Sequence, residues 1–216
     1  MKTYSAKEIF YTLQGEGANA GRAAVFCRFS GCNLWSGLER DRASAICKFC
    51  DTDFVGTDGL GGGKFKGADA LADTIDNYWP NHLPQDKQGQ KLVVCTGGEP
   101  LMQLDDALIT ALHERGFEIA VETNGTIKAP AGIDWICVSP KADSEIVQTS
   151  GQELKLVFPQ DENKPEDYLH MDFEHFFLQP KDDAQQSQNV QDTIDYIHEN
   201  PQWRLSVQSH KITGIR

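Results

Sequence analysis

Apolar residues gather along the chain in short runs that have the length of β-strands. These runs are rich in β-branched and aromatic residues, and most of them end in small, polar or charged residues. Runs of this kind are typical of buried strands. The pattern predicts strands at residues 6–11, 23–29, 91–95, 117–122, 133–138, 153–158, 175–178 and 204–208.

Apolar residues at helical spacing separate several of these strands. Helices are expected at residues 68–79, 104–115 and 188–199, and glycine or proline follows each of them. Strands that alternate with helices or loops predict an α/β fold with a parallel sheet or a partial barrel. Ligands in such folds bind at the carboxyl ends of the strands. The glycine-rich residues 51–66 are expected to form a mobile loop.

Length and charge narrow the classes of protein to consider. The 216 residues fit one domain, which we expect to span residues 1–216. The N-terminus has no apolar signal-peptide core and no apolar run could span a membrane, so we expect a cytoplasmic protein with no membrane partner. A net charge of −12 argues against a nucleic-acid partner, because phosphate binding needs clustered Lys and Arg. A small-molecule substrate is expected instead.

Four of the six cysteines lie within residues 26–52. Cys27 is inside the second predicted strand, and the other three come after that strand. Three of them, Cys32, Cys47 and Cys50, are spaced as one isolated cysteine and a Cys-x-x-Cys pair. This spacing allows a structural zinc site with Cys27 as fourth ligand, a disulfide pair, or an iron-sulfur cluster with three protein ligands. Strand alternation points Cys27 opposite to Arg28 and into the core.

Other polar and reactive residues have weaker signals. Arg28 lies in an apolar strand, where it is either at a solvent edge of the sheet or in a pocket that binds an anion. Cys95 and Cys137 lie in apolar strands and are expected to be buried. The histidines without metal-like spacing are expected at the surface or in packing roles: His82, His113, His170, His175 and His198.

The ends of the predicted strands carry short polar motifs that could form one site. They are the cysteine loop, TGGEP at 96–100, ETNGT at 122–126, SPK at 139–141 and LQPK at 178–181. With GGEP and ETNGT, the cysteine loop resembles the radical S-adenosylmethionine (SAM) superfamily. TLQGEG at 12–17, CRFSGCNLW at 27–35 and FCDTDF at 49–54 resemble, more narrowly, the 7-carboxy-7-deazaguanine synthase family. The 14 residues between Cys32 and Cys47 depart from the usual Cys-x3-Cys-x2-Cys loop but match this subgroup.

The resemblance extends over essentially the whole chain and implies a fold and two cofactors. The fold would be a partial, TIM-like βα barrel of the radical SAM type. Cys32, Cys47 and Cys50 would hold a [4Fe-4S] cluster, and SAM would chelate the iron that has no protein ligand. Gly98 and Glu99 would bind the methionine amino group of SAM. The positions that match its surroundings are Gly98, Glu99, Glu122, Asn124, Ser139, Pro140, Lys141, Gln179, Pro180, Lys181 and Asp182.

The resemblance also implies a substrate pocket and a Mg²⁺ site. Thr52 matches the position that ligates Mg²⁺, although a hydroxyl needs substrate oxygens and water to complete the octahedron. Arg28 would pair with a substrate carboxylate, and no side chain is expected to act as a nucleophile. The positions that match the pocket are Leu13, Gln14, Gly15, Arg28, Thr96, His210 and Arg216.

The activity implied is conversion of 6-carboxy-5,6,7,8-tetrahydropterin to 7-carboxy-7-deazaguanine with loss of ammonia, a lyase step in queuosine and 7-deazapurine biosynthesis. An external one-electron donor of the flavodoxin or ferredoxin type would reduce the cluster, and a homodimer is expected by family analogy. Two alternatives stay open. One is a small activating enzyme that installs a glycyl radical on a partner protein. The other is a non-catalytic zinc protein, in which Cys27 closes the site.

Overall fold

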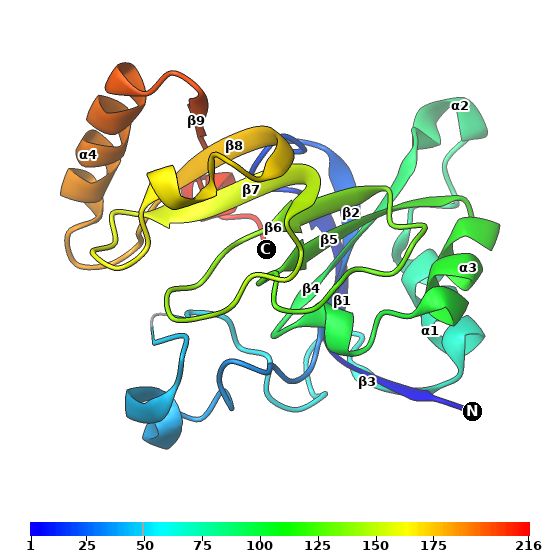
Figure 1. Cartoon of the computed structure of the whole chain (residues 1–216). Coiled ribbons are helices and arrows are strands. Elements are labelled where there is room, and N and C mark those ends of the chain that lie inside the picture. The colour runs from blue at the N-terminus through cyan, green and yellow to red at the C-terminus, as the bar shows by residue number, and fades with distance from the viewer. Residues whose placement is uncertain (49) are drawn as a thin grey trace.

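A curved β-sheet forms the centre of the molecule (Figure 1). The computed structural model describes residues 1–48 and 50–216. Phe49, in the FCDTDF motif, lies outside the described residues. The strands are β1 (Thr3–Leu13), β2 (Ala23–Phe29), β3 (Gly63–Lys66), β4 (Lys91–Gly97), β5 (Phe117–Thr123), β6 (Trp135–Val138), β7 (Ser150–Phe158), β8 (Asp172–Pro180) and β9 (Trp203–Leu205). The α-helices are α1 (Ala68–Tyr78), α2 (Gln85–Gln88), α3 (Asp106–Glu114), α4 (Gln186–Glu199) and α5 (Ser209–Thr213), and the 3₁₀-helices are η1 (Glu39–Ser44), η2 (Pro100–Met102) and η3 (Pro165–Tyr168).

The strand order produces an open sheet rather than a closed barrel. The nine strands follow the order β3-β1-β2-β4-β5-β6-β7-β8-β9. Strand β1 pairs antiparallel with β2 and β3, while β2 and the strands from β4 to β9 pair in parallel. The expected α/β fold with a partial barrel of the radical SAM type is confirmed. The parallel strands all end at one edge, where side chains from distant parts of the sequence meet.

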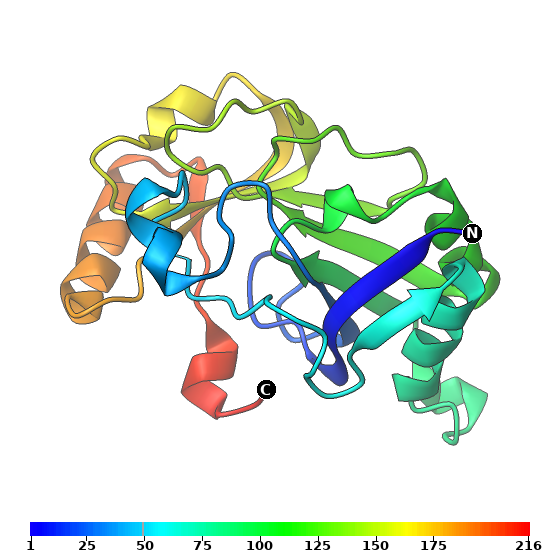
Figure 2. The same ribbon diagram turned by 90° about the horizontal axis from the view of Figure 1, so that it is seen from below.

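The two faces of the sheet have different partners. Helices α1 and α3 cover one face of β1, β2, β4 and β5, and α4 covers the same face at β8 and β9 (Figures 1 and 2). Side chains such as Ile9, Val25 and Cys95 are fully buried between this face and the helices. Burial of such apolar surface is the main favourable term in folding. The opposite face is the interior of the partial barrel. A cavity opens on this side at the carboxyl ends of the parallel strands.

A β-bulge in β1 changes which face its side chains reach. Ala6 is opposite Phe29 and Glu8 is opposite Arg28, so Lys7 is an extra residue between two consecutive pairs. Tyr4 and Ala6 are therefore in the core, whereas Glu8 points into the barrel interior. Bulges of this kind commonly redirect side chains next to a functional site. Strand alternation alone does not reveal the change.

Several sequence expectations needed correction. Residues 63–66 were expected in a mobile loop but form β3, which pairs with the first half of β1. Residues 59–60 are also tied to β1, because Gly59 N donates to Lys7 O and Ile9 N donates to Leu60 O. The last strand was expected at residues 204–208 but spans Trp203–Leu205, and the segment after residue 208 forms the helix α5. These differences arise from pairing with distant segments, which local glycine content does not indicate. Among the described residues, no helix combines the length and the apolar character needed to cross a bilayer.

Candidate active site

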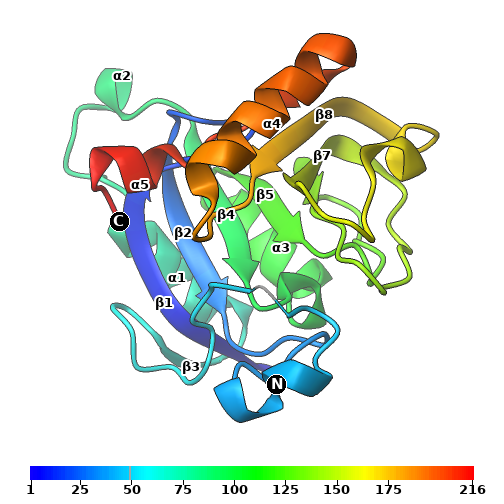
Figure 3. The same cartoon turned by 90° about the vertical axis from the view of Figure 1, so that its left-hand side faces the viewer.

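A cavity of about 770 Å³ opens at the carboxyl ends of the parallel strands. Figure 3 shows how β2, β4 and β5 lie side by side in this part of the sheet. Of the residues that the sequence singled out, all but Cys32, Glu99 and Pro140 line it. The predicted residues in its wall are Leu13, Gln14, Gly15, Arg28, Cys47, Cys50, Thr52, Thr96, Gly98, Glu122, Asn124, Ser139, Lys141, Gln179, Pro180, Lys181, Asp182, His210 and Arg216. The five strand-end motifs are therefore brought together around one space.

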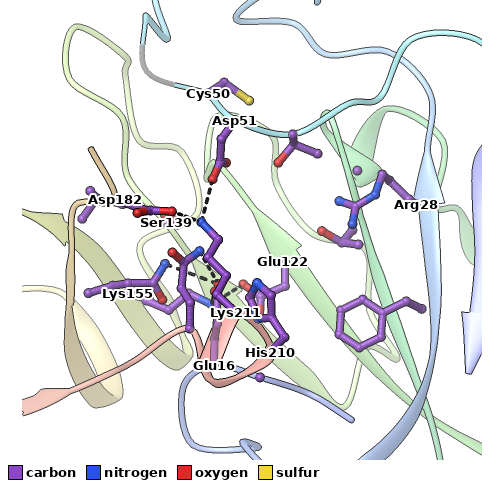
Figure 4. A pocket seen from close by; sticks show the side chains of 18 of the residues that line it. Glu16, Arg28, Cys50, Asp51, Glu122, Ser139, Lys155, Asp182, His210 and Lys211 are labelled. Atoms are coloured by element: carbon purple, nitrogen blue, oxygen red, sulfur yellow. Dashed lines mark hydrogen bonds and ion pairs between the residues drawn. The ribbon is translucent and has the colours of Figure 1, made fainter. Parts of the chain in front are cut away.

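Arg28 faces this cavity rather than solvent at the edge of the sheet. Strand β2 is flanked by β1 and β4, and the Arg28 guanidinium points into the cavity (Figure 4). Its Nε donates to Glu8 Oε1 at 2.9 Å, and Arg216 donates to the other oxygen of the same carboxylate. Burial alone would raise the pKa of Glu8, but the two guanidinium groups outweigh it and lower that pKa. A fixed carboxylate thus orients two cationic side chains beside the ligand space.

The TLQGEG loop is joined to the C-terminal helix. Ser209 N and Ser209 Oγ donate to Gly15 O at 3.0 and 2.9 Å. A Cβ at Gly15 would lie 2.5 Å from His210 Nδ1, so only glycine lets the two segments approach this closely. Gln14 Oε1 accepts from the backbone N–H of Gly15, and its Nε2 donates to Glu122 Oε1. Glycine at position 15 thus permits the close approach of the two backbones.

Charged residues that are buried or partly buried form the inner wall of the cavity. Lys155 Nζ lies 2.8 Å from Glu16 Oε2 and 2.9 Å from Glu122 Oε2 (Figure 4). The negative charge of Glu153, also on β7, acts on Lys155 as well. Burial opposes the charged form of Lys155, but the surrounding acidic groups raise its pKa. Burial would also raise the pKa of Glu16, yet the charge and hydrogen bond of Lys155 lower it to about 2. Burial raises the pKa of Glu122, so this carboxylate takes up a proton more readily than Glu16 does.

The three predicted cluster cysteines lie near one another without converging on one point. The neighbouring Cys47 thiol and the Thr52 N–H lower the pKa of Cys50 to about 6, against the opposing effect of burial. Burial raises the pKa of Cys32, although its sulfur accepts from Leu34 N at 3.4 Å. Within residues 1–48 and 50–216, no three His, Cys, Asp or Glu side chains are arranged to hold a single metal ion.

Cys27 is separate from this group. It is fully buried in the core beside Cys95, on the face of β2 opposite Arg28. Burial raises the pKa of its thiol well above the ordinary value. The expected burial of Cys27, Cys95 and Cys137 is confirmed.

The GGEP turn packs directly on the cysteine loop. A Cβ at Gly98 would lie 2.0 Å from Gly31 O and 2.8 Å from the Cβ of Cys32, so a larger residue would displace the loop. Glu99 is buried, and its carboxylate accepts from Leu101 N, Thr123 Oγ1 and Asn124 N at 2.7 to 3.0 Å. These bonds tie the turn to β5. The role of Glu99 in binding an amino group stays a prediction.

Lys211 connects three segments across the mouth of the cavity. From α5 its Nζ pairs with Asp182, which follows β8, and lies 3.3 Å from Asp51, which follows Cys50 (Figure 4). Burial would lower the pKa of Lys211, but these two carboxylates raise it. Sequence reasoning missed Lys211, as well as Glu8, Glu16 and Lys155. The signal for Lys155 was present, since it is a charged residue inside an apolar run, as Arg28 is.

Comparison with known proteins agrees with this geometry. No protein-family model matches the chain. The chain is 65% identical over 213 residues to 7-carboxy-7-deazaguanine synthase from Caulobacter vibrioides and 60% identical over 213 residues to that from Burkholderia multivorans, with 99% of each chain covered. The crystal structure of QueE from Escherichia coli matches with a TM-score of 0.71 and 25% identity, covering 96% of this chain and 95% of that one. Identity this high over nearly the full length of both sequences shows common descent, and the chain belongs to the 7-carboxy-7-deazaguanine synthase family.

Proposed function

We propose that the chain converts 6-carboxy-5,6,7,8-tetrahydropterin to 7-carboxy-7-deazaguanine, as a radical SAM enzyme and carbon-nitrogen lyase. The observation that carries this proposal is the single cavity in which Arg28, the TLQGEG loop, Thr52 and the Cys-x-x-Cys pair meet. A cationic group held by Glu8 suits a carboxylated substrate, because a guanidinium binds a carboxylate through two parallel hydrogen bonds.

The donor set fits a [4Fe-4S] cluster better than a closed zinc site. Thiolate sulfur suits iron, and a cluster spreads its ligands over several iron atoms, so three thiols need not converge on one ion. The fourth cysteine that a zinc site would require, Cys27, is buried in the core. Cys32, Cys47 and Cys50 would hold the cluster, and the strand ends around Gly98, Ser139 and Gln179 would surround SAM. When bound, these cofactors would supply the one-electron and hydrogen-abstraction chemistry.

The protein's own residues would bind and orient the substrate. The Arg28 guanidinium would hold the substrate carboxylate, and Gln14 with Glu122 would offer hydrogen-bond donors and acceptors to a nitrogen-rich ring. Thr52 would contribute one oxygen to a Mg²⁺ whose other ligands are substrate oxygens and water. Lys211 and His210 would help to exclude water at the mouth and floor of the site. Positioning of this kind can supply much of a rate enhancement.

The test is anaerobic turnover of the reconstituted protein with 6-carboxytetrahydropterin, SAM and a chemical reductant. We expect 7-carboxy-7-deazaguanine and ammonia, with about four iron atoms bound per chain. Cys50→Ala should lose iron, whereas Cys27→Ala should keep it. Cleavage of SAM without deazaguanine would contradict the substrate assignment and leave a glycyl-radical activating enzyme as the alternative. About one tightly bound zinc without iron would contradict the cluster.

Three further features remain proposals of the same kind. An external one-electron donor of the flavodoxin or ferredoxin type is expected to replace the chemical reductant. A homodimer is expected from family analogy and can be measured by sedimentation. The continuous sheet and the core residues that contact more than one cluster, such as Ile136, support a single domain over residues 1–216.

A further inference from the structure

The 14-residue insertion between Cys32 and Cys47 contains an arginine that is held in place on several sides. The insertion forms η1, which carries Arg40 and Arg42. The Arg40 side chain is 79% exposed, whereas that of Arg42 is 29% exposed. Two arginines with the same charge and nearly the same position in sequence thus have different surroundings. The difference indicates that Arg42 has a role within the loop.

Arg42 makes three kinds of contact. Its guanidinium carbon lies 4.1 Å from the centre of a Trp35 ring, a distance typical of cation–π stacking. Its Nε donates to both carboxylate oxygens of Glu39 at 2.9 and 2.8 Å. Its NH1 donates to the carbonyl oxygens of Lys48 and Cys50 at 3.0 and 3.1 Å. The planar group is therefore fixed against an indole ring, and one nitrogen contacts two peptide groups of the Cys-x-x-Cys segment.

The same side chain reaches both parts of the cysteine set. Trp35 packs edge-on against Phe54 at 5.6 Å between ring centres, and it directly follows Leu34, whose N–H donates to Cys32 Sγ. The carbonyls of Lys48 and Cys50 accept from NH1 of the same guanidinium. The carbonyl of Cys50 belongs to the peptide group next to its own side chain, so fixing it restricts the direction of the Cys50 thiol, and the carbonyl of Lys48 lies between the two cysteines of the pair. Arg42 joins the Cys32 end of the loop to the Cys-x-x-Cys end.

We propose that Arg42 is a positioning residue that holds the cysteine pair in the geometry that binds the iron-sulfur cluster. The inference rests on the proposed function, since it concerns how the chain holds that cluster. It assigns a role to the long insertion, in which residues 36–46 are all exposed or partly exposed. The role depends on the shape of the guanidinium, because one planar group serves the indole, the Glu39 carboxylate and two carbonyls together.

The experiment measures the rate at which anaerobically reconstituted protein loses iron to a chelator, together with the EPR spectrum of the reduced cluster. We expect Arg42→Gln to release iron about tenfold faster or more, because two hydrogen bonds from a charged donor are lost. Its EPR signal should broaden as the ligand geometry becomes heterogeneous. Arg42→Lys keeps the charge but not the planar fork, and should release iron at an intermediate rate. Arg40→Gln removes the same charge from the same helix and should match the wild type.

Several outcomes would overturn the proposal. Iron release and EPR spectra of Arg42→Gln equal to those of the wild type would exclude the positioning role while leaving the proposed function intact. Wild-type iron retention in Arg42→Lys would show that charge alone is sufficient, which contradicts the geometric role. A wild-type protein that binds no iron would overturn the proposed function and this inference with it. Far-UV circular dichroism of the apoproteins checks that each variant folds.

Discussion

Single charged residues inside apolar strands identify the cavity wall. Arg28 on β2 and Lys155 on β7 are each surrounded in sequence by residues that belong to the core, yet both point into the barrel interior. Each is paired with a carboxylate from a different segment, which offsets the cost of burying its charge. An ion pair of this kind adds little to stability, so the placement of these residues is better explained by a ligand. Such residues are therefore the best single-residue evidence for a binding site in this chain.

Replacing Arg28 tests the carboxylate-binding role. We expect Arg28→Ala to raise KM for the carboxylated pterin about 10- to 100-fold, because hydrogen bonds between charged groups contribute about 1.5 to 3 kcal/mol. Iron content and SAM cleavage should persist. Arg22→Ala is the matched control, since Arg22 forms a similar pair with Glu118 but does not line the cavity. Loss of iron in the Arg28 variant would show instead that Arg28 supports the structure of the loop.

Replacing Lys155 tests the buried charge network through its pH dependence. In the wild type, the pKa of Glu16 is about 2, below its ordinary value of 4.5. Glu16 therefore stabilises the fold above pH 4.5, and this contribution is lost as pH falls from 4.5 toward 2. Lys155→Met leaves the partly buried Glu16 and Glu122 without their cation, which should lower the free energy of unfolding by about 3 kcal/mol at neutral pH.

The deficit of Lys155→Met should shrink as pH falls, because unpaired buried carboxylates have raised pKa values and bind protons in the folded state. Thermal unfolding followed by circular dichroism between neutral and acidic pH measures this. Lys2→Met removes a more exposed pair with Asp105 and should cost about 1 kcal/mol or less. A deficit that does not change with pH would mean that lost packing, rather than charge, explains the destabilisation.

At the scale of elements, α5 and the tail close the site by contacts with three other segments. Ser209 contacts Gly15, Lys211 contacts Asp51 and Asp182, and Thr12 Oγ1 donates to the backbone oxygen of Arg216. Five residues of helix are too short to be stable alone, so these contacts determine its position. The position of α5 across the mouth of the cavity therefore depends on these contacts.

Removing the Lys211 contacts should weaken the closure without affecting the cluster. We expect Lys211→Ala to raise KM for SAM several-fold, because Asp182 lies in the segment predicted to surround SAM and would lose its partner. The difference from wild type should decrease at high salt, since the Lys211 pairs are partly exposed. Lys64→Ala removes an exposed lysine from β3 and serves as control. Equal kinetics in the two variants would contradict the role of Lys211.

The elements differ in how far the sequence could predict them. Strands β2, β4 and β5 were found within a few residues because each is an uninterrupted apolar run between polar ends. Strand β3 was missed because its four residues, two of them lysine, gain their hydrogen bonds from β1. The bulge at Lys7 was also missed, and with it the position of Glu8. The site residues that match known motifs could be predicted, and most of them line one cavity. Ion-pairing residues such as Glu16 and Lys211 could not be predicted, because their partners come from distant segments of the chain.

At the scale of the whole molecule, the cysteine loop is attached to a core that does not depend on it. Among the described residues, none of the three core clusters includes a residue from 30–62. The loop has its own small packing group, in which Trp35 contacts Phe54 and Arg42. Hydrogen bonds from Asn33 Nδ2 to Thr126 and from Asn124 to Asn33 join it to the end of β5. The sheet should therefore fold before a cofactor binds.

This arrangement predicts how the protein responds when iron is removed. Chelation should leave the far-UV circular dichroism almost unchanged, because the strands and main helices lie outside the loop. Trypsin should then cut faster after Arg40, Arg42 and Lys48, since regions with few buried contacts open at low free-energy cost. Mass spectrometry of the fragments from iron-free and reconstituted protein measures the difference. Cuts that appear equally in β4, β5 and β7 would mean that iron removal unfolds the whole chain, and that the cluster is part of its folding core.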